Sequence, residues 1–265
     1  MKTMIKTIYI YWLELQKFAP VLQQLVRQQL ILRYRRTALG YLWTLINPLL
    51  MMSVTAIVFA TLFKVELKTF AIFLFAGMIP WNFFNSAVVQ SSSAFISNES
   101  LIRKIYLPKL LFPLSVTLGI LIDSFLSFIA LFLIIILLGG ALSWSLIFVP
   151  IAFTLLFFFT FGLALIVSIT TVFFRDLQYI MTVAMQALFF LTPVIYNKRM
   201  LAGKISWLVS MNPVAYYIEL FRAPLVEAVF PSLSVIINAI VFALLSMALG
   251  VAIFIRYEKK IVFRL

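Results

Sequence analysis

Residues 111–138, "LFPLSVTLGILIDSFLSFIALFLIIILL", decide the fold class of this chain. The run is longer than the roughly 20 mostly apolar residues that a helix needs to cross a bilayer. It contains one charged residue, Asp123. Its apolar residues are continuous, whereas the strands of a membrane barrel alternate between apolar and polar positions. We therefore predict a membrane-spanning helix here.

The whole chain repeats this character. Its composition is 65% hydrophobic and 11% charged, with a mean hydropathy of +1.14, which no water-soluble fold could cover with polar surface. The 265 residues have room for about six spans with short loops. We expect an all-α integral membrane protein with one membrane domain over 41–265, and with spans at 41–63, 70–96, 111–138, 146–172, 179–196 and 233–255. The later half of the second span, "NSAVVQSSSAF", is too polar for lipid and should face other helices or water.

The residue types that are missing narrow the chemistry. Cysteine and histidine are absent, which excludes disulfides and thiolate chemistry and removes the commonest metal ligand and acid-base group. We therefore expect neither a cofactor nor catalysis on this chain. The net charge of +13 comes from basic residues that flank the apolar runs, where anionic lipid headgroups are better partners than nucleic acid.

The distribution of Lys and Arg predicts the orientation. Fifteen of them fall before the first span, in the loops at 97–110 and 173–178, and after the last span, against six on the alternate side. This excess places both termini in the cytoplasm, and we expect no cleavable signal before the first span. Residues 1–40 should form a cytoplasmic segment of amphipathic helices lying at the membrane interface. A frayed, lipid-associated tail is the alternative.

Two spans carry polar faces. Pro48 frees the carbonyl of Thr44 from its helical hydrogen bond. The resulting face of the first span comprises Thr44, Asn47, Met51 and Thr55, and that of the fifth comprises Thr182, Gln186, Phe189, Pro193 and Tyr196. Polar and aromatic groups that alternate on one face suit a path for sugar rings, which stack on aromatics and hydrogen-bond through hydroxyls. Helix packing is the alternative interpretation.

One residue and two further segments are candidates for a structural or functional role. Asp123 is expected to be a structural hydrogen-bonding residue rather than a proton carrier, because no His, Lys or Arg lies within the apolar runs to pair with it. The loop at 97–110 predicts a short amphipathic helix that docks on a soluble partner, or else a simple basic turn. The segment 199–232 is too broken to span, and we expect short helices that enter the outer leaflet and return.

Six stretches, in order along nearly the whole chain, resemble the ABC-2 type permeases that export bacterial surface polysaccharide such as O-antigen. They are "YRRTALGYLWTLINPLL" at 34–50, "AGMIPWNFF" at 76–84, "NESLIRKIYLPKLLFPL" at 98–114, "FFRDLQYI" at 173–180, "TPVIY" at 192–196 and "NPVAYYIELFR" at 212–222.

The resemblance implies a homodimer with six spans in each chain, bound to two copies of a cytoplasmic ATPase, that moves a lipid-linked glycan across the inner membrane. This chain has no GxxxxGK[ST] phosphate loop, so ATP and Mg would bind to the partner. The coupling residues would be Glu99, Leu101, Arg103 and Lys104. The segment 199–230 resembles the periplasmic gate, with Trp207, Tyr216, Tyr217, Glu219 and Arg222. An undecaprenyl pyrophosphate headgroup would need cations at the entrance, where Arg33, Arg35 and Arg36 lie, although these arginines also suit lipid headgroups.

Other functions are weaker candidates. Teichoic acid, capsular polysaccharide or a drug is an alternative cargo for the same family. An intramembrane enzyme would need a nucleophile with a base, paired carboxylates or metal ligands, and this chain has neither His nor Cys and only one buried Asp. A bare channel is compatible with the composition alone.

Overall fold

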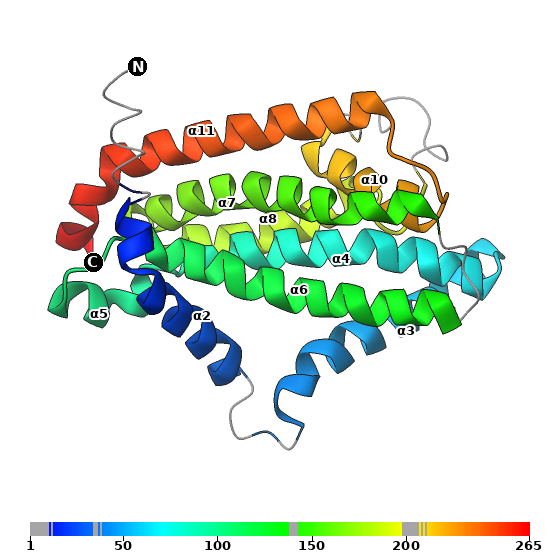
Figure 1. The fold of residues 1–265 in the computed structure, drawn as a ribbon, viewed down its shortest axis with the longest axis horizontal. Helices are drawn as coiled ribbons and strands as arrows, with labels where there is room; N and C mark the ends of the chain where they lie inside the picture. Colours follow the sequence, from blue (N-terminus) through cyan, green and yellow to red (C-terminus); the bar gives the residue numbers. More distant parts are fainter. Residues whose placement is uncertain are drawn as a thin grey trace.

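A computed structural model of the chain describes residues 11, 13–33, 37, 39–137, 143–197, 207, 209 and 211–265, apart from the side chains of residues 32, 33 and 41. The regular elements among these residues are helices, which run mostly along one long axis (Figure 1). They are α2 (Ala19–Arg33), η1 (Gly40–Leu42), α3 (Trp43–Phe63), α4 (Leu67–Ser92), η2 (Ile96–Asn98), α5 (Glu99–Lys104), α6 (Leu111–Leu137), η3 (Trp144–Phe148), α7 (Val149–Phe173), α8 (Leu177–Leu191), α10 (Pro213–Leu225) and α11 (Leu233–Arg264). The all-helical prediction is confirmed for the described part of the chain.

Among the described residues, five helices are long and apolar enough to cross a membrane. They are α3, α4, α6, the η3–α7 pair and α11, and they correspond to five of the six expected spans. The last of them, α11, continues to Arg264, well past the expected end at 255. The other expected span corresponds to α8, which has only 15 residues. A helix of this length rises about 22 Å, which is short of the roughly 30 Å hydrocarbon core, so six spans stay a prediction.

The early end of α8 corrects the expected fifth span at 179–196. Thr192 adopts an extended conformation, with φ −107° and ψ 132°, immediately before Pro193. The proline ring disfavours the helical conformation of the residue before it, and proline has no N–H for a helical hydrogen bond. Pro193 and Tyr196 therefore lie in a turn beyond α8, and the prediction that they continue its helical face is wrong.

Helix α4 is the centre of the bundle. It packs against α3, α6, α7, α8 and α10, and 61% of its most apolar stretch of 18 residues is buried. The polar later half of the second expected span is partly turned inward: Ser91 and Ser92 are buried, whereas Gln90 is exposed. Ser92 donates a hydrogen bond to the backbone carbonyl of Val89, which offsets the burial of its hydroxyl.

Glycines let α7 and α11 pack at very short range. A Cβ atom on Gly162 would lie 2.3 Å from the carbonyl carbon of Ser246, and one on Gly250 would lie 2.4 Å from the oxygen of Gly162. Ser246 donates a 2.7 Å hydrogen bond to the carbonyl of Phe159 across the same crossing. Small residues that bring two backbones together, supported by a hydrogen bond, are a typical device for joining helices in lipid.

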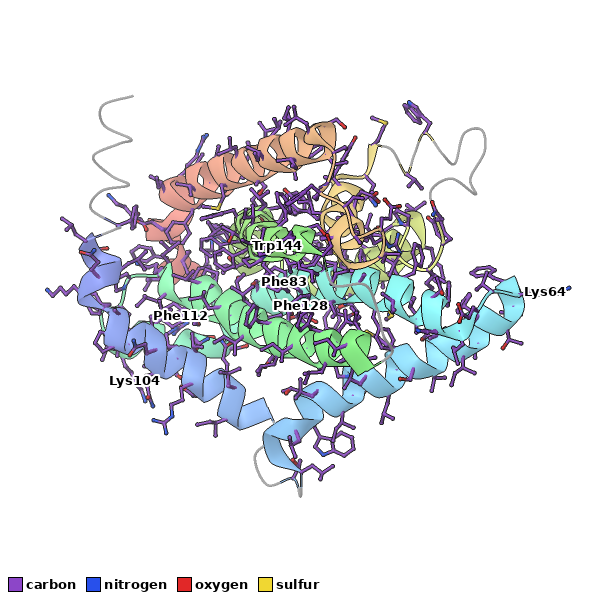
Figure 2. All side chains as sticks on the ribbon, turned by 45° about the vertical axis from the view of Figure 1, so that its right-hand side comes forward. Lys64, Phe83, Lys104, Phe112, Phe128 and Trp144 are labelled. Carbon is purple, nitrogen blue, oxygen red and sulfur yellow. The ribbon has the colours of Figure 1, made fainter. Side chains whose placement is uncertain are left out.

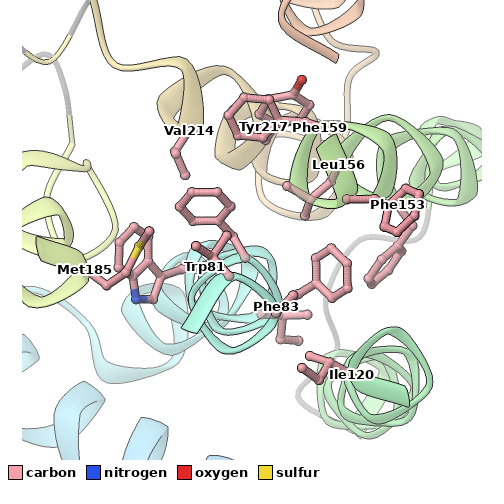
Figure 3. Packing of buried hydrophobic residues seen from close by; sticks show 14 of the residues in the cluster. Trp81, Phe83, Ile120, Phe153, Leu156, Phe159, Met185, Val214 and Tyr217 are labelled. Atoms are coloured by element: carbon pink, nitrogen blue, oxygen red, sulfur yellow. The ribbon is translucent and has the colours of Figure 1, made fainter. Parts of the chain in front are cut away.

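Aromatic rings fill the space between α4, α7 and α10 (Figure 3). The ring centroids of Phe159 and Tyr217 are 4.7 Å apart, and those of Phe153 and Phe221 are 4.8 Å apart. Tyr217 is fully buried and donates a 2.7 Å hydrogen bond to the carbonyl of Ala239 in α11. These contacts fix α10 to the bundle.

Helix α2 is amphipathic as expected. Leu25 is buried, whereas Gln23, Gln24 and Arg27 are exposed. The buried side packs against α6, where the Gln29 amide is 3.4 Å from the hydroxyl of Ser115. That α2 also lies at the lipid interface stays a prediction.

Candidate transport site

The two ends of the bundle carry different features. Lys104, at the end of α5, and Lys64, in the turn between α3 and α4, lie at opposite ends (Figure 2). Helix α5 shares its end with the C-terminus, and α10 lies toward the end that carries the α3–α4 turn (Figure 1). A path across the membrane would have to connect the two ends, and three of the hollows among the described residues contain predicted site residues.

A groove of about 270 Å³ between α4 and α8 combines amide and aromatic side chains. Asn82, Asn85 and Gln186 supply the amides, and Gln186 is exposed. Trp81 and Phe189 supply rings whose centroids are 5.4 Å apart. Each amide both donates and accepts hydrogen bonds, and the rings offer apolar faces. The groove can therefore contact a polyhydroxylated chain at many positions along that chain.

The groove contains both residues that the sequence pattern singled out and residues that it did not. Gln186 and Phe189 were predicted to line a path, and the structure brings both into the groove. Asn82 and Asn85 were not named as site residues, although two amides in an otherwise apolar span were a visible signal. They come from the second expected span, whose later half, beginning at Asn85, was expected to face other helices or water.

The other predicted lining residues near α8 do not reach the groove. Thr182 is exposed, and its hydroxyl donates to the carbonyl of Gln178 in its own helix. The hydroxyl of Tyr196 donates a 2.9 Å hydrogen bond to the carbonyl of Phe190. This bond folds the turn after α8 back onto the end of the helix.

The predicted face of α3 is divided between two directions. Thr44 is buried, Met51 is 63% exposed, and Thr55 donates a 2.7 Å hydrogen bond to the carbonyl of Met51. Thr44 and Asn47 line a polar hollow of about 110 Å³ between α3, α4 and α6. The four residues therefore do not form one wall in this protomer.

Asp123 lies in this polar hollow. It is 9% exposed, and Ser124 of α6 and Asn82 of α4 line the hollow beside it. The hydroxyl of Ser127 donates a 2.9 Å hydrogen bond to the backbone carbonyl of Asp123. The volume suits a few water molecules at about 30 Å³ each. This surrounding supports the expected role of Asp123 as a hydrogen-bonding residue.

A set of hydrogen bonds joins the end of α8 to α10. The guanidinium of Arg222 donates to the carbonyls of Pro193 and Val194 at 2.5 Å each. Asn212 begins α10, because its side-chain oxygen accepts from the N–H of Val214, and its amide donates to Thr192. The carbonyls that the turn leaves without helical partners are satisfied by these bonds. The end of α8 and α10 therefore form one unit, which we call the latch.

Helix α4 completes the latch. The guanidinium carbon of Arg222 lies 3.7 Å from the ring centroid of Phe73, a cation–π contact. A Cβ on Gly77 would lie 2.8 Å from the Nη2 atom of Arg222, so glycine provides the room for the guanidinium. Arg222 is 6% exposed, and its contacts hold the turn after α8 against α10.

The residues expected at the periplasmic gate divide into two groups. Tyr216, Glu219 and Arg222 line a cavity of about 440 Å³. Tyr217 belongs to the buried aromatic packing of α10, and Trp207 is 63% exposed and not among the lining residues of this cavity. The first of the two short helices expected in 199–232 lies largely outside the described residues, and α10 is the second.

At the opposite end, α5 presents charges and apolar groups. Glu99 pairs with Arg103 at 2.8 Å, and Arg103 and Lys104 are exposed. Leu101 is half-buried and packs on the core, which fixes the helix to the bundle. Tyr106 is 74% exposed. A short basic helix beside an exposed aromatic ring is a typical protein-docking surface.

Contacts connect the α5 segment to the N-terminal segment and α11. The hydroxyl of Tyr106 lies 3.5 Å from a carboxylate oxygen of Glu14, and the charge of Glu14 raises the pKa of Tyr106. Burial, and a hydrogen bond with the carboxylate of Glu258, raise the pKa of Tyr11. Both phenols therefore stay protonated donors at physiological pH. These two pairs link the residues just after α5, by way of the N-terminal segment, to α11.

The expected entrance arginines fall at the limit of what the structure describes. Arg35 and Arg36 lie outside the described residues. Arg33 is the last residue of α2, and its side chain also lies outside them. Their contact with substrate stays a prediction.

The five long apolar helices of the described part of the chain define a multi-pass membrane protein. The family model for ABC-2 type transporters matches residues 20–226. This chain therefore belongs to the ABC-2 type transporter family, as the six sequence stretches indicated.

Named relatives cover most of the chain. Two O-antigen export system permease proteins RfbA from Klebsiella pneumoniae are each 32% identical over 200 residues, which is 75% of this chain and 77% of each relative. The O-antigen export system permease protein RfbA from Myxococcus xanthus is 30% identical over 220 residues, 82% of this chain and 85% of the relative. The polysialic acid transport protein KpsM from Escherichia coli is 23% identical over 266 residues, 93% of this chain and 96% of the relative.

Proposed function

We propose that this chain is the permease subunit of an ATP-driven exporter that moves lipid-linked O-antigen polysaccharide across the bacterial inner membrane. Membership of the ABC-2 family supports the transport role, and the relatives named for O-antigen export support the cargo. The observation that carries the proposal is the groove of amide and aromatic side chains between α4 and α8. The relative named for polysialic acid transport is more distant, at 23% identity, so capsular glycan is the second choice.

The groove also supports a homodimer. Gln186 is exposed on an apolar helix, and leaving an amide unsatisfied in hydrocarbon costs about 1–3 kcal/mol on protein scales. Only 17% of the most apolar stretch of 18 residues in α3 is buried. A second copy that packs along α3 and α8 would enclose the amides around a hydrated path. We propose that the glycan passes between the two copies with its lipid, undecaprenyl pyrophosphate, remaining in the bilayer.

Movement along this path would be driven from the α5 end. A cytoplasmic ATPase, in two copies, would dock on α5 and displace it when nucleotide binds. The pairs from Tyr106 to Glu14 and from Tyr11 to Glu258 would carry the displacement to α11. With both termini and α5 in the cytoplasm, α10 and the latch lie on the periplasmic side, where they hold the exit.

Replacement of the three groove amides tests the path. The triple variant Asn82→Leu, Asn85→Leu, Gln186→Leu keeps an apolar surface but removes the hydrogen-bonding groups for glycan. Surface O-antigen on gels and by immunoblot should fall at least tenfold at unchanged protein level. Asn238→Leu is the matched control, because Asn238 is half-buried on α11, its amide donates to the carbonyl of Ser234, and it is not among the residues that line the groove. Full export by the triple variant would show that the glycan does not pass along the groove.

Charge reversal on α5 tests the coupling. The double variant Arg103→Glu, Lys104→Glu should lose the ATPase on affinity purification from native membranes, because it changes two exposed basic groups on the docking surface. Lys109→Glu, in the same loop but after α5, is the control. Unchanged co-purification together with normal substrate-stimulated hydrolysis would show that the ATPase docks elsewhere.

A further inference from the structure

The cavity beside α10 contains the kinds of groups that bind sugars. Its volume of about 440 Å³ falls within the roughly 300–1,000 Å³ of small-molecule pockets. It is bounded by α4, the turn after α8, α10 and the start of α11. The polar lining residues are Asn197, Tyr216, Glu219, Arg222 and Glu227.

The charges in this cavity are unequal. Two carboxylates, Glu219 and Glu227, are exposed, against one buried guanidinium, that of Arg222. Arg222 already donates to two carbonyls of the latch, and Glu219 is close enough to act on its charge. The net charge of the described lining residues is therefore negative, and the charge of Arg222 is partly offset by that of Glu219. An anionic ligand would gain little from the guanidinium and would be repelled by the carboxylates.

The remaining groups favour a polyhydroxylated ligand. Carboxylates accept hydrogen bonds from sugar hydroxyls, and such charge-assisted bonds are among the stronger ones. Tyr216 is half-buried and adds a phenol and a ring, while Val226 and Val235 supply apolar surface. The Nε–H of Arg222 is buried and has no hydrogen-bond partner among the described residues. A buried donor without a partner is unusual, and a ligand hydroxyl or a water would satisfy it.

We infer that this cavity is a saccharide subsite at the exit, which binds uncharged or amino-bearing sugar units of the exported glycan and disfavours acidic ones. The inference rests on the proposed function. It adds a substrate preference, because repeat units rich in uronic acid or other acidic sugars would not occupy the site. The latch holds one wall of the subsite, so occupancy would be communicated to the end of α8.

Binding of defined oligosaccharides tests the inference. The permease with its ATPase is placed in lipid nanodiscs and titrated by saturation-transfer NMR with short oligosaccharides cut from the surface polysaccharide of the same cells. A trigalacturonate of similar size is the acidic probe. Wild type should bind the first and not the second. Glu219→Gln with Glu227→Gln should bind the first at least tenfold more weakly and bind trigalacturonate more tightly than wild type does.

Controls separate this inference from the proposed function. Glu66→Gln changes an exposed carboxylate in the α3–α4 turn, outside the lining of the cavity, and should bind as wild type does. Equal binding by wild type and the double variant, or tight binding of trigalacturonate by wild type, overturns the subsite. If deletion of the gene abolishes surface glycan while either result holds, the export function stands without the subsite. If deletion leaves surface glycan intact, the export function itself is wrong.

Discussion

Replacing Gly162 by alanine should loosen the crossing of α7 and α11. The added Cβ would lie 2.3 Å from the carbonyl carbon of Ser246, whereas ordinary contacts begin at 3.4 Å, so the helices must part by about 3.4 − 2.3 = 1.1 Å. The two nearest atoms are the backbone carbonyl carbon and oxygen of Ser246, which cannot turn aside as the end of a side chain can. The crossing is thus the least tolerant place for an extra methyl group among the described glycines.

The expected cost follows from two contributions. Overpacking a well-filled contact costs about 1–3 kcal/mol. Separation of the helices also weakens the bond from Ser246 to the carbonyl of Phe159, and such bonds in membranes are worth about 0.6 kcal/mol on average. Alanine is favoured over glycine within helices by up to about 1 kcal/mol, which offsets part of this cost. We expect Gly162→Ala to lose about 1–3 kcal/mol of unfolding free energy.

Gly119→Ala is the matched control. It makes the same change inside α6, where the nearest atom to the added Cβ is the side-chain Oε1 of Gln29 at 3.1 Å. Gln29 can move, and alanine is favoured over glycine within helices by up to about 1 kcal/mol. Gly119→Ala should therefore be neutral or mildly stabilising. SDS-induced unfolding in mixed micelles, followed by circular dichroism, compares the two variants. If Gly162→Ala is as stable as Gly119→Ala, the close crossing does not hold the bundle together.

Two further predictions concern buried charges. Arg222→Lys keeps the positive charge but loses the planar guanidinium that reaches the carbonyls of Pro193 and Val194 together. Amide hydrogen exchange over 192–197 should therefore rise at least tenfold, while the rest of the chain keeps its protection. Unchanged exchange over 192–197 would contradict the latch. Asp123→Asn should change the free energy of unfolding in detergent by less than about 1 kcal/mol. Asp123→Leu should lower it by about 1–3 kcal/mol, because it leaves the polar groups of the hollow without their partner. Equal stability of the two variants would contradict the structural role of Asp123.

The sequence predicted the spans because long apolar runs have few alternatives in a membrane. Four helices begin and end close to the expected limits, and the polar half of α4 buries Ser91 and Ser92. The fifth expected span was drawn too long although Pro193 was visible, because hydropathy continues past the proline while the helical backbone does not.

Side-chain direction could not be predicted to the same degree. Helical spacing placed Thr44 and Met51 on one face, yet one is buried and the other exposed, because the direction in which α3 meets α4 and α6 is a property of the packing. Tyr217 and Tyr216 are neighbours in sequence, but α10 turns one into the core and the other to the cavity. Arg222 was expected at a gate, and only the fold shows that it caps the turn after α8.

ATP-driven glycan movement in proteoliposomes tests the central claim most directly. The permease and its ATPase are reconstituted with lipid-linked O-antigen in the leaflet that the ATPase faces, and arrival in the opposite leaflet is measured with a membrane-impermeant lectin. The account predicts transfer that requires ATP and both subunits and that is lost in the groove triple variant. Transfer without ATP or without the ATPase, or none with all components present, would contradict it.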